Sequence, residues 1–136
     1  MNWDNLEERR AYNRAWHKKN AARLAPRKLA WYHAHKHEVR AYKRRLIKGK
    51  KRRVLTFYGH KHTLRCSWRK CTVVDLDCLT LDHVHNDGGL QRKRLKHHGG
   101  GSVMYAWIIR NNFPEGFRTL CANHQLKKEI NRRGAK

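Results

Sequence analysis

The sequence predicts an α+β protein in which a basic helical arm precedes a folded C-terminal domain. The arm is predicted because residues 9–70 are rich in alanine, lysine and arginine, which favour helices, and contain Glu38 as their only acidic residue. The folded domain is predicted because most carboxylates follow residue 70, together with a short apolar, β-prone run at residues 79–83. We therefore divide the chain into an arm with its linker, residues 1–53, and a C-terminal domain, residues 54–136.

The charge of the chain indicates a polyanionic partner. Lysines and arginines total 33 against 10 aspartates and glutamates, which gives a formal net charge of +23. Side chains of this kind bind nucleic acid by releasing the cations condensed on its phosphates. No apolar run is long enough to span a bilayer, and the first residues lack the apolar stretch of a signal peptide. We therefore expect a cytoplasmic protein that binds nucleic acid and no membrane.

Two helices are predicted in the arm, at residues 4–24 and 27–47, because Pro26 is the only interior helix breaker before Gly49. A basic linker is expected to follow at residues 49–53. Aromatic residues recur along both helices, and two interpretations of them stay open: they pack the two helices together, or they belong to an arm that becomes ordered only on DNA. The aromatic residues concerned are Tyr12, Trp16, Trp31 and Tyr42.

Two elements stand out in the C-terminal domain. Residues 79–83 predict a strand that ends in the pair Asp82-His83 and leads to two glycines at residues 88–89. Further along, residues 102–112 predict a helix, and its Met104, Trp107 and Ile108 recur at the spacing of one core-facing side.

The cysteines form two separated pairs with ligand spacing. Cys66 and Cys71 are joined by four residues in a C-x4-C loop, and Cys121 is followed by His124 in a C-x2-H pair. Each short loop can supply two ligands of a tetrahedral zinc site, although the same cysteines could be reduced thiols in a core. The remaining cysteine, Cys78, is expected to be a small buried residue of the strand.

The ordered set of these motifs resembles the HNH endonucleases of the ββα-metal superfamily, most closely the small freestanding enzymes of phages and mobile elements. The segments that carry the resemblance are CSWRKC at residues 66–71, LTLDHVHNDGG at 79–89, YAW at 105–107, NFPEGFR at 112–118 and LCANHQLKK at 120–128. The resemblance covers about residues 54–130. It implies a zinc-stapled ββα-metal nuclease domain behind the basic arm.

The resemblance also implies a role for each motif residue. His83 matches the general base that deprotonates the attacking water, and Asp82 matches the carboxylate that binds a catalytic Mg²⁺ or Mn²⁺. Gln125 lies where the family has the Asn or His that completes this site, so the match is weaker there. The structural zinc ligands correspond to Cys66, Cys71, Cys121 and His124, with His124 in place of the usual cysteine.

The expected function is metal-dependent hydrolysis of phosphodiester bonds in DNA, with double-stranded DNA as the expected substrate. The alternative is a zinc-stapled nucleic-acid-binding protein whose HNH site has decayed. Candidate DNA contacts are Arg44, Arg45, Lys50, Lys51, Arg52 and Arg53 near the end of the arm, and Arg92, Lys93, Arg94 and Lys96 after the two glycines. A homodimer is compatible with these expectations, as is a location in a bacterial host cell if the protein is encoded by a phage.

Overall fold

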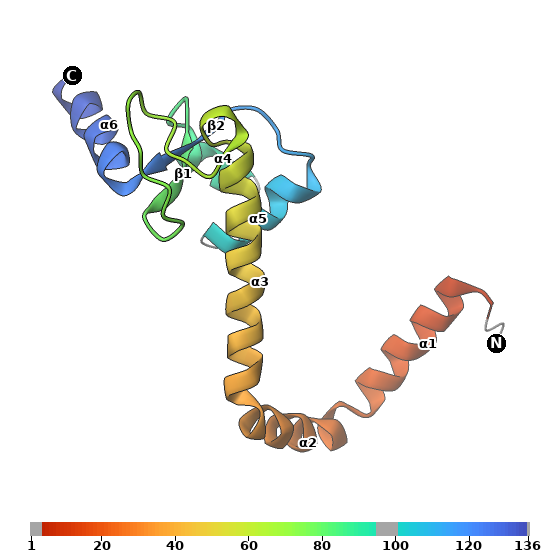
Figure 1. Ribbon diagram of the computed structural model, residues 1–136. Coiled ribbons are helices and arrows are strands. Elements are labelled where there is room, and N and C mark those ends of the chain that lie inside the picture. Colours follow the sequence, from red (N-terminus) through yellow and green to blue (C-terminus); the bar gives the residue numbers. More distant parts are fainter. Residues whose placement is uncertain (1–3, 95–100, 136) are drawn as a thin grey trace. The chain divides into compact units, whose positions relative to one another are not determined.

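A computed structural model describes residues 4–94 and 101–135, without the side chain of Arg94 (Figure 1). The chain divides into two compact parts, residues 1–43 and residues 44–136, which are described separately. We call the second part the body.

The first part consists of consecutive helices. Helix α1 spans Leu6–Lys19, α2 spans Ala21–Ala34, and α3, which spans Lys36–Phe57, begins here. The side chain of Asn5 caps α1 by accepting hydrogen bonds from the main-chain N–H groups of Glu7 and Glu8. The predicted division into two helices at Pro26 is therefore wrong. The breaks fall at Asn20 and His35, and Pro26 lies inside α2, where it removes one main-chain donor without ending the helix.

The four aromatic residues singled out in the sequence are exposed, whereas Tyr32 beside them is half-buried. The exposed fractions of Tyr12, Trp16, Trp31 and Tyr42 lie between 39% and 57%. None of the residues of α1 and α2, all of which the structure describes, is buried. The interpretation that these rings pack two helices together is wrong, because single-residue junctions do not allow consecutive helices to lie side by side along their length.

The body combines a two-stranded antiparallel sheet with helices (Figure 1). Strand β1 spans Leu79–His83 and pairs with β2, which spans Phe117–Cys121, so that Asp82 lies opposite Arg118 and His83 opposite Phe117. The other elements are the 3₁₀ turn η1 (His60–His62), α4 (Gly88–Arg94), α5 (Gly101–Arg110) and α6 (Ala122–Gly134). This mixture of strands and helices confirms the α+β prediction. The strand at residues 79–83 is also confirmed.

The core of the body starts at the end of α3. Val54 and Leu55 are fully buried there, and Leu55 packs with Leu79 and Leu120 of the two strands. Residues 49–53, expected to be a linker, are instead part of α3, because the buried residues that follow hold the last turns of this helix in place. Ile108 of α5 is fully buried with Val54 in a second cluster.

The predicted helix after residue 100 is confirmed as α5, which ends two residues earlier than expected. Met104 and Trp107 pack against the second core cluster, as their spacing predicts. Among the described residues, no helix combines the length and hydrophobicity needed to cross a bilayer.

Thr119 connects β2 to the end of α3. Its hydroxyl donates a hydrogen bond to the carbonyl of Leu55 over 2.8 Å, and its main-chain N–H donates to the carbonyl of Tyr58 over 3.0 Å. The carbonyl of Thr119 in turn accepts from the N–H of Ser67 in the cysteine loop over 2.8 Å. Thr119 is fully buried, so these bonds are shielded from water and fix the strand that carries Arg118 and Cys121.

Candidate functional site

Three cysteines and one histidine form a compact group of potential metal ligands. The ligand atoms of Cys66, Cys71, Cys121 and His124 all lie within 4.8 Å of one another. The sulfur atoms of Cys71 and Cys121 are 4.0 Å apart, and Nδ1 of His124 is 3.6 Å from the sulfur of Cys66. A tetrahedral zinc with Zn–S bonds of about 2.3 Å would separate its ligand atoms by roughly 3.8 Å. The group therefore fits a metal ion such as zinc, as the spacing of the two pairs predicts.

The ligands come from two places in the fold, and local contacts position each pair. Cys66 and Cys71 close a loop in which the guanidinium of Arg65 donates to the carbonyl of Cys71 over 2.8 Å. Cys121 ends β2, and His124 lies in the first turn of α6. The N–H of Cys121 donates to the sulfur of Cys66 over 3.2 Å, a contact that stabilises a thiolate.

The thiols of the group differ in their electrostatic surroundings. Burial raises the pKa of the Cys66 thiol to about 11, so a thiolate there needs a neutralising partner. Burial also acts to raise the pKa of Cys71, but a hydrogen bond with the backbone of Val73 and the neighbouring thiols outweigh it and lower the pKa. Trp68 stacks on the ring of His124 with the ring centroids 4.9 Å apart, which fixes the direction of the imidazole.

Cys78 does not belong to this group. The prediction that it is buried in the strand is wrong, because its side chain is exposed and lies one residue before β1. Its contribution is from the main chain: the carbonyl of Cys78 accepts a hydrogen bond from the N–H of Ala122 at the start of α6. The register explains the exposure, since Leu79, the next residue, takes the core position opposite Cys121.

Asp82 is the centre of a buried polar cluster between β1, β2 and α6. The residue is 2% exposed. Lys128 of α6 contacts both carboxylate oxygens, at 2.9 Å and 2.8 Å, and Arg118 donates to Oδ2 over 2.8 Å. The side-chain amide of Gln125 donates to Oδ1 over 3.0 Å. The structure thus brings together the predicted pair Asp82 and Gln125, and adds two cations to it.

These partners determine the charge state of Asp82. Burial alone would raise the pKa of this carboxyl group, but the hydrogen bonds from Lys128, Arg118 and Gln125 outweigh it and hold the pKa below its ordinary value. Asp82 is therefore ionised throughout the physiological pH range.

His83 lies on the opposite face of β1 from Asp82. Its Nε2 is 2.6 Å from the side-chain oxygen Oε1 of Gln91 in α4, and its ring meets Phe117 edge-on with the centroids 4.9 Å apart. Gly88 allows this arrangement, because a Cβ atom at that position would lie 2.8 Å from Nδ1 of the ring. A histidine that acts as general base is expected to have its ring oriented by a main-chain carbonyl. Here the side-chain amide of Gln91 orients the ring of His83 instead.

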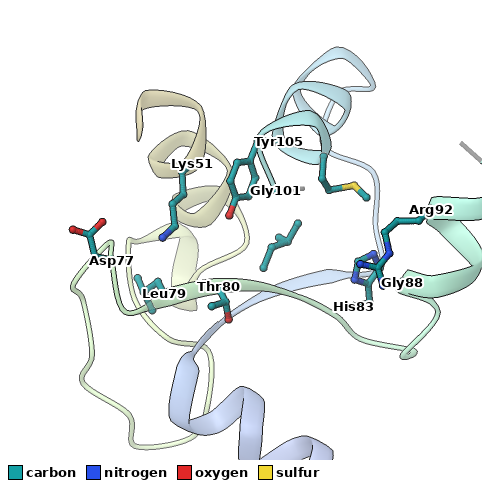
Figure 2. Close-up of a pocket in the computed structure, with 11 residues that line it drawn as sticks. Lys51, Asp77, Leu79, Thr80, His83, Gly88, Arg92, Gly101 and Tyr105 are labelled. Carbon is teal, nitrogen blue, oxygen red and sulfur yellow. The ribbon is translucent and has the colours of Figure 1, made fainter. Parts of the chain in front are cut away.

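A cavity of about 370 Å³ opens beside His83. Figure 2 shows His83, Gly88 and Arg92 at one end of it and Lys51 and Tyr105 at the other. Two of the residues predicted to contact DNA, Lys51 and Arg92, thus line the same cavity as the predicted general base.

The remaining predicted DNA contacts lie on helices of the body. Exposed side chains on α3 are those of Arg44, Arg45, Lys50, Arg52 and Arg53, and Lys93 is exposed on α4. The guanidinium of Arg53 lies 5.4 Å from the centre of the Phe113 ring. Arg94 ends α4, but its side chain lies outside the described part of the chain, as does the whole of Lys96.

Three residues of the site have no counterpart among the predictions. Arg118 could be found only from the strand register, which places it opposite Asp82. Lys128 lies one helical turn after Gln125 and so shares its side of α6, a signal that the sequence does contain. Nothing in the sequence indicates the contact of Gln91 with His83, because it depends on how α4 lies against β1.

No protein-family model matches this chain, and no curated protein or solved structure matches it significantly.

Proposed function

We propose that the C-terminal domain is an HNH-type endonuclease that hydrolyses phosphodiester bonds in DNA, with His83 as general base and a divalent cation held by Asp82 and Gln125. One observation carries the proposal. Asp82 at the end of β1 contacts Gln125 of α6 over 3.0 Å, while the adjacent His83 faces a cavity that is also lined by Lys51. The resemblance to HNH endonucleases implies this arrangement: a carboxylate and a base lie on the two faces of one strand end, and a helix follows the second strand.

The oxygen atoms near Asp82 suit a hard cation. Mg²⁺ and Mn²⁺ prefer oxygen ligands, and the Asp82 carboxylate supplies two. Gln125 presents its amide nitrogen to Asp82, and its Oε1 lies 3.5 Å from the hydroxyl of Thr80. A half-turn of the amide group would exchange oxygen and nitrogen and place a second oxygen ligand beside the carboxylate. When bound, such a cation supplies Lewis acid stabilisation of the charge that develops on the phosphate and the leaving oxygen.

His83 has a defined role in this proposal. Because Oε1 of Gln91 can only accept a hydrogen bond, it selects the tautomer that carries its proton on Nε2. The unprotonated Nδ1 then lies beside Gly88, where a Cβ atom would be only 2.8 Å away and would obstruct it. This nitrogen can accept the proton of a water molecule that attacks the phosphate. Gln91 is a positioning residue that acts through His83.

Positive side chains around the cavity can hold the DNA backbone. Lys51 and Arg92 line the cavity that contains His83, and an ammonium and a guanidinium there can each bind a phosphate oxygen. The exposed basic residues of the arm can bind DNA phosphates as well, in a manner independent of sequence. We take double-stranded DNA as the partner.

A zinc ion in the Cys3His group would have a structural role. It would join the loop of Cys66 and Cys71 to the junction of β2 and α6, and thereby fix the helix turn that carries Gln125 next to His124. All four protein ligands are supplied, which is typical of a structural zinc site rather than a catalytic one.

A second function is favoured by one specific observation. Both oxygens of Asp82 already accept hydrogen bonds from cationic groups, those of Lys128 and Arg118. Such saturation is what a decayed site would show, and it favours a zinc-stapled nucleic-acid-binding protein without catalysis.

Cleavage of supercoiled plasmid DNA in Mg²⁺ or Mn²⁺ distinguishes the two functions. The nuclease proposal predicts nicked or linear products with the wild-type protein, none with His83→Ala, and none when EDTA is added. His60→Ala is the matched control, since His60 is an exposed histidine of η1, and it should cut like the wild type. Binding of DNA without cleavage by the wild type under all these conditions would refute the nuclease and support the binding protein.

A further inference from the structure

The ammonium group of Lys128 has the surroundings of a bound metal cation. Its Nζ lies 2.9 Å and 2.8 Å from the two carboxylate oxygens of Asp82, and 2.6 Å from the main-chain carbonyl of His83. The Lys128 side chain is 13% exposed and that of Asp82 is 3% exposed. Three oxygen atoms from the end of one strand thus surround a positive charge that is largely shielded from water.

Lys128 differs in this respect from the other cation of the cluster. Arg118 reaches only Oδ2 of Asp82, and its side chain is 34% exposed. Lys128 alone among the described residues bridges both carboxylate oxygens and a main-chain carbonyl at the strand end. A buried carboxylate is strongly unfavourable unless it is paired, and Lys128 is the partner of Asp82 that contacts both of its oxygens.

A divalent cation at Asp82 requires the same oxygen atoms. Its ligands lie at about 2.0–2.2 Å, closer than the hydrogen-bond distances of an ammonium group. An ammonium and a metal ion that shared the two oxygens would be close enough to repel each other strongly in an environment shielded from water. Either cation can occupy the carboxylate, but not both in this geometry.

We propose that Lys128 is the resident counter-ion of the Asp82 site and that a divalent cation must displace it to bind. The inference rests on the proposed function, since it concerns the regulation of the same cation site. It implies that the protein without DNA binds Mg²⁺ or Mn²⁺ weakly, because the ion competes with a cation tethered to α6. The long, flexible side chain of lysine suits this exchange, since it can move its charge to solvent or to a DNA phosphate without moving the helix.

The test is Mn²⁺ binding to the full-length protein without DNA, followed by the electron paramagnetic resonance signal of the free ion. Lys128→Met keeps much of the length of the side chain and removes its charge. This variant is expected to bind Mn²⁺ at least about tenfold more tightly than the wild type. In the wild type the ion must first break the ion pair of Lys128 with Asp82, and a pair shielded from water is stronger than an exposed one. Lys127→Met, which removes the same charge from an exposed neighbour on α6, should leave the affinity unchanged. Asp82→Asn in the Lys128→Met background should abolish the gain.

Equal or weaker Mn²⁺ binding by Lys128→Met would overturn the inference, and so would an equal gain from Lys127→Met. If Lys128→Met does not fold, NMR of the wild-type protein labelled with ¹⁵N at lysine decides the question. The ammonium resonance of Lys128, protected by three acceptors, should be visible without metal and lose its protection in saturating Mg²⁺. Retention of this protection would refute displacement. Neither measurement depends on cleavage, so a protein that exchanges Lys128 for Mn²⁺ yet cuts no DNA would refute the nuclease alone.

Discussion

Removal of the metal from the Cys3His group is expected to unfold the body. Binding of a structural zinc contributes about 10 kcal/mol or more to folding, whereas a small domain is stable by only about 5–15 kcal/mol in total. Here the ligands are also part of the core: Cys66, Cys71 and Cys121 belong to the same buried cluster as Leu55 and the strand residues. Loss of the ion would therefore leave three thiols packed in the cluster without the metal bonds that join them. The free energy of unfolding of the body would fall to about zero.

The assay compares near-ultraviolet circular dichroism before and after a strong chelator, with zinc measured in both samples. The signal of packed aromatic residues of the body, such as Trp68, should collapse with loss of one zinc per chain. Cys71→Ser should reproduce the effect, whereas Cys78→Ser, which alters an exposed cysteine outside the group, should keep both zinc and signal. An unchanged spectrum in protein shown to have lost its zinc, or no stoichiometric zinc in protein purified without chelator, would refute the reasoning.

Four further predictions each concern one feature. Gly88→Ala should destabilise the body by about 1–3 kcal/mol in urea unfolding, because the added Cβ would overlap the ring of His83. Gly89→Ala is the control: its added Cβ would have no neighbour within 4 Å, so its stability should stay close to that of the wild type. Equal effects of the two changes would contradict the close packing of His83 on Gly88. Gln91→Leu should slow plasmid cleavage by about tenfold or more and shift the ring's ¹⁵N signals away from the Nε2-protonated tautomer; unchanged signals would contradict the positioning role. The difference in free energy of unfolding between the wild type and Asp82→Asn should be fully present above pH about 4 and be lost as the pH falls further. The reason is that the pKa of Asp82 is lower in the folded than in the unfolded protein. A difference that does not change with pH would contradict this. Deletion of residues 1–43 should reduce the salt dependence of DNA binding by about 0.9 in log–log slope for each phosphate that these residues neutralise, and an unchanged slope would exclude residues 1–43 from DNA binding.

Local spacing made the metal group predictable from the sequence. Cys66 and Cys71, like Cys121 and His124, are close in the chain, so each pair is held together by a short loop, and the structure brings the two pairs together. The strand at residues 79–83 was predictable for the same reason, because the tendency of a short apolar run to form a strand depends on the residues of that run.

Features that depend on long-range contacts were not predictable. The contact of Arg118 with Asp82 requires the register of strands far apart in the chain. The continuation of α3 through residues 49–53 depends on burial of the residues that follow, which composition does not reveal. The helix breaks at Asn20 and His35 were not predicted either, because neither residue is a strong breaker, whereas Pro26 is tolerated within a helix.

The distance along the chain between the two ligand pairs has a consequence for folding. Cys71 and Cys121 are 50 residues apart, and both strands of the sheet lie within this interval, with β2 ending at Cys121 itself. Closing a loop of this length in an unfolded chain costs roughly 4 kcal/mol of chain entropy, which antiparallel pairing of five-residue strands cannot easily repay alone. An ion that joined the two pairs would close this loop and so lower the entropic cost of pairing the strands. Folding of the body would then be coupled to capture of the ion.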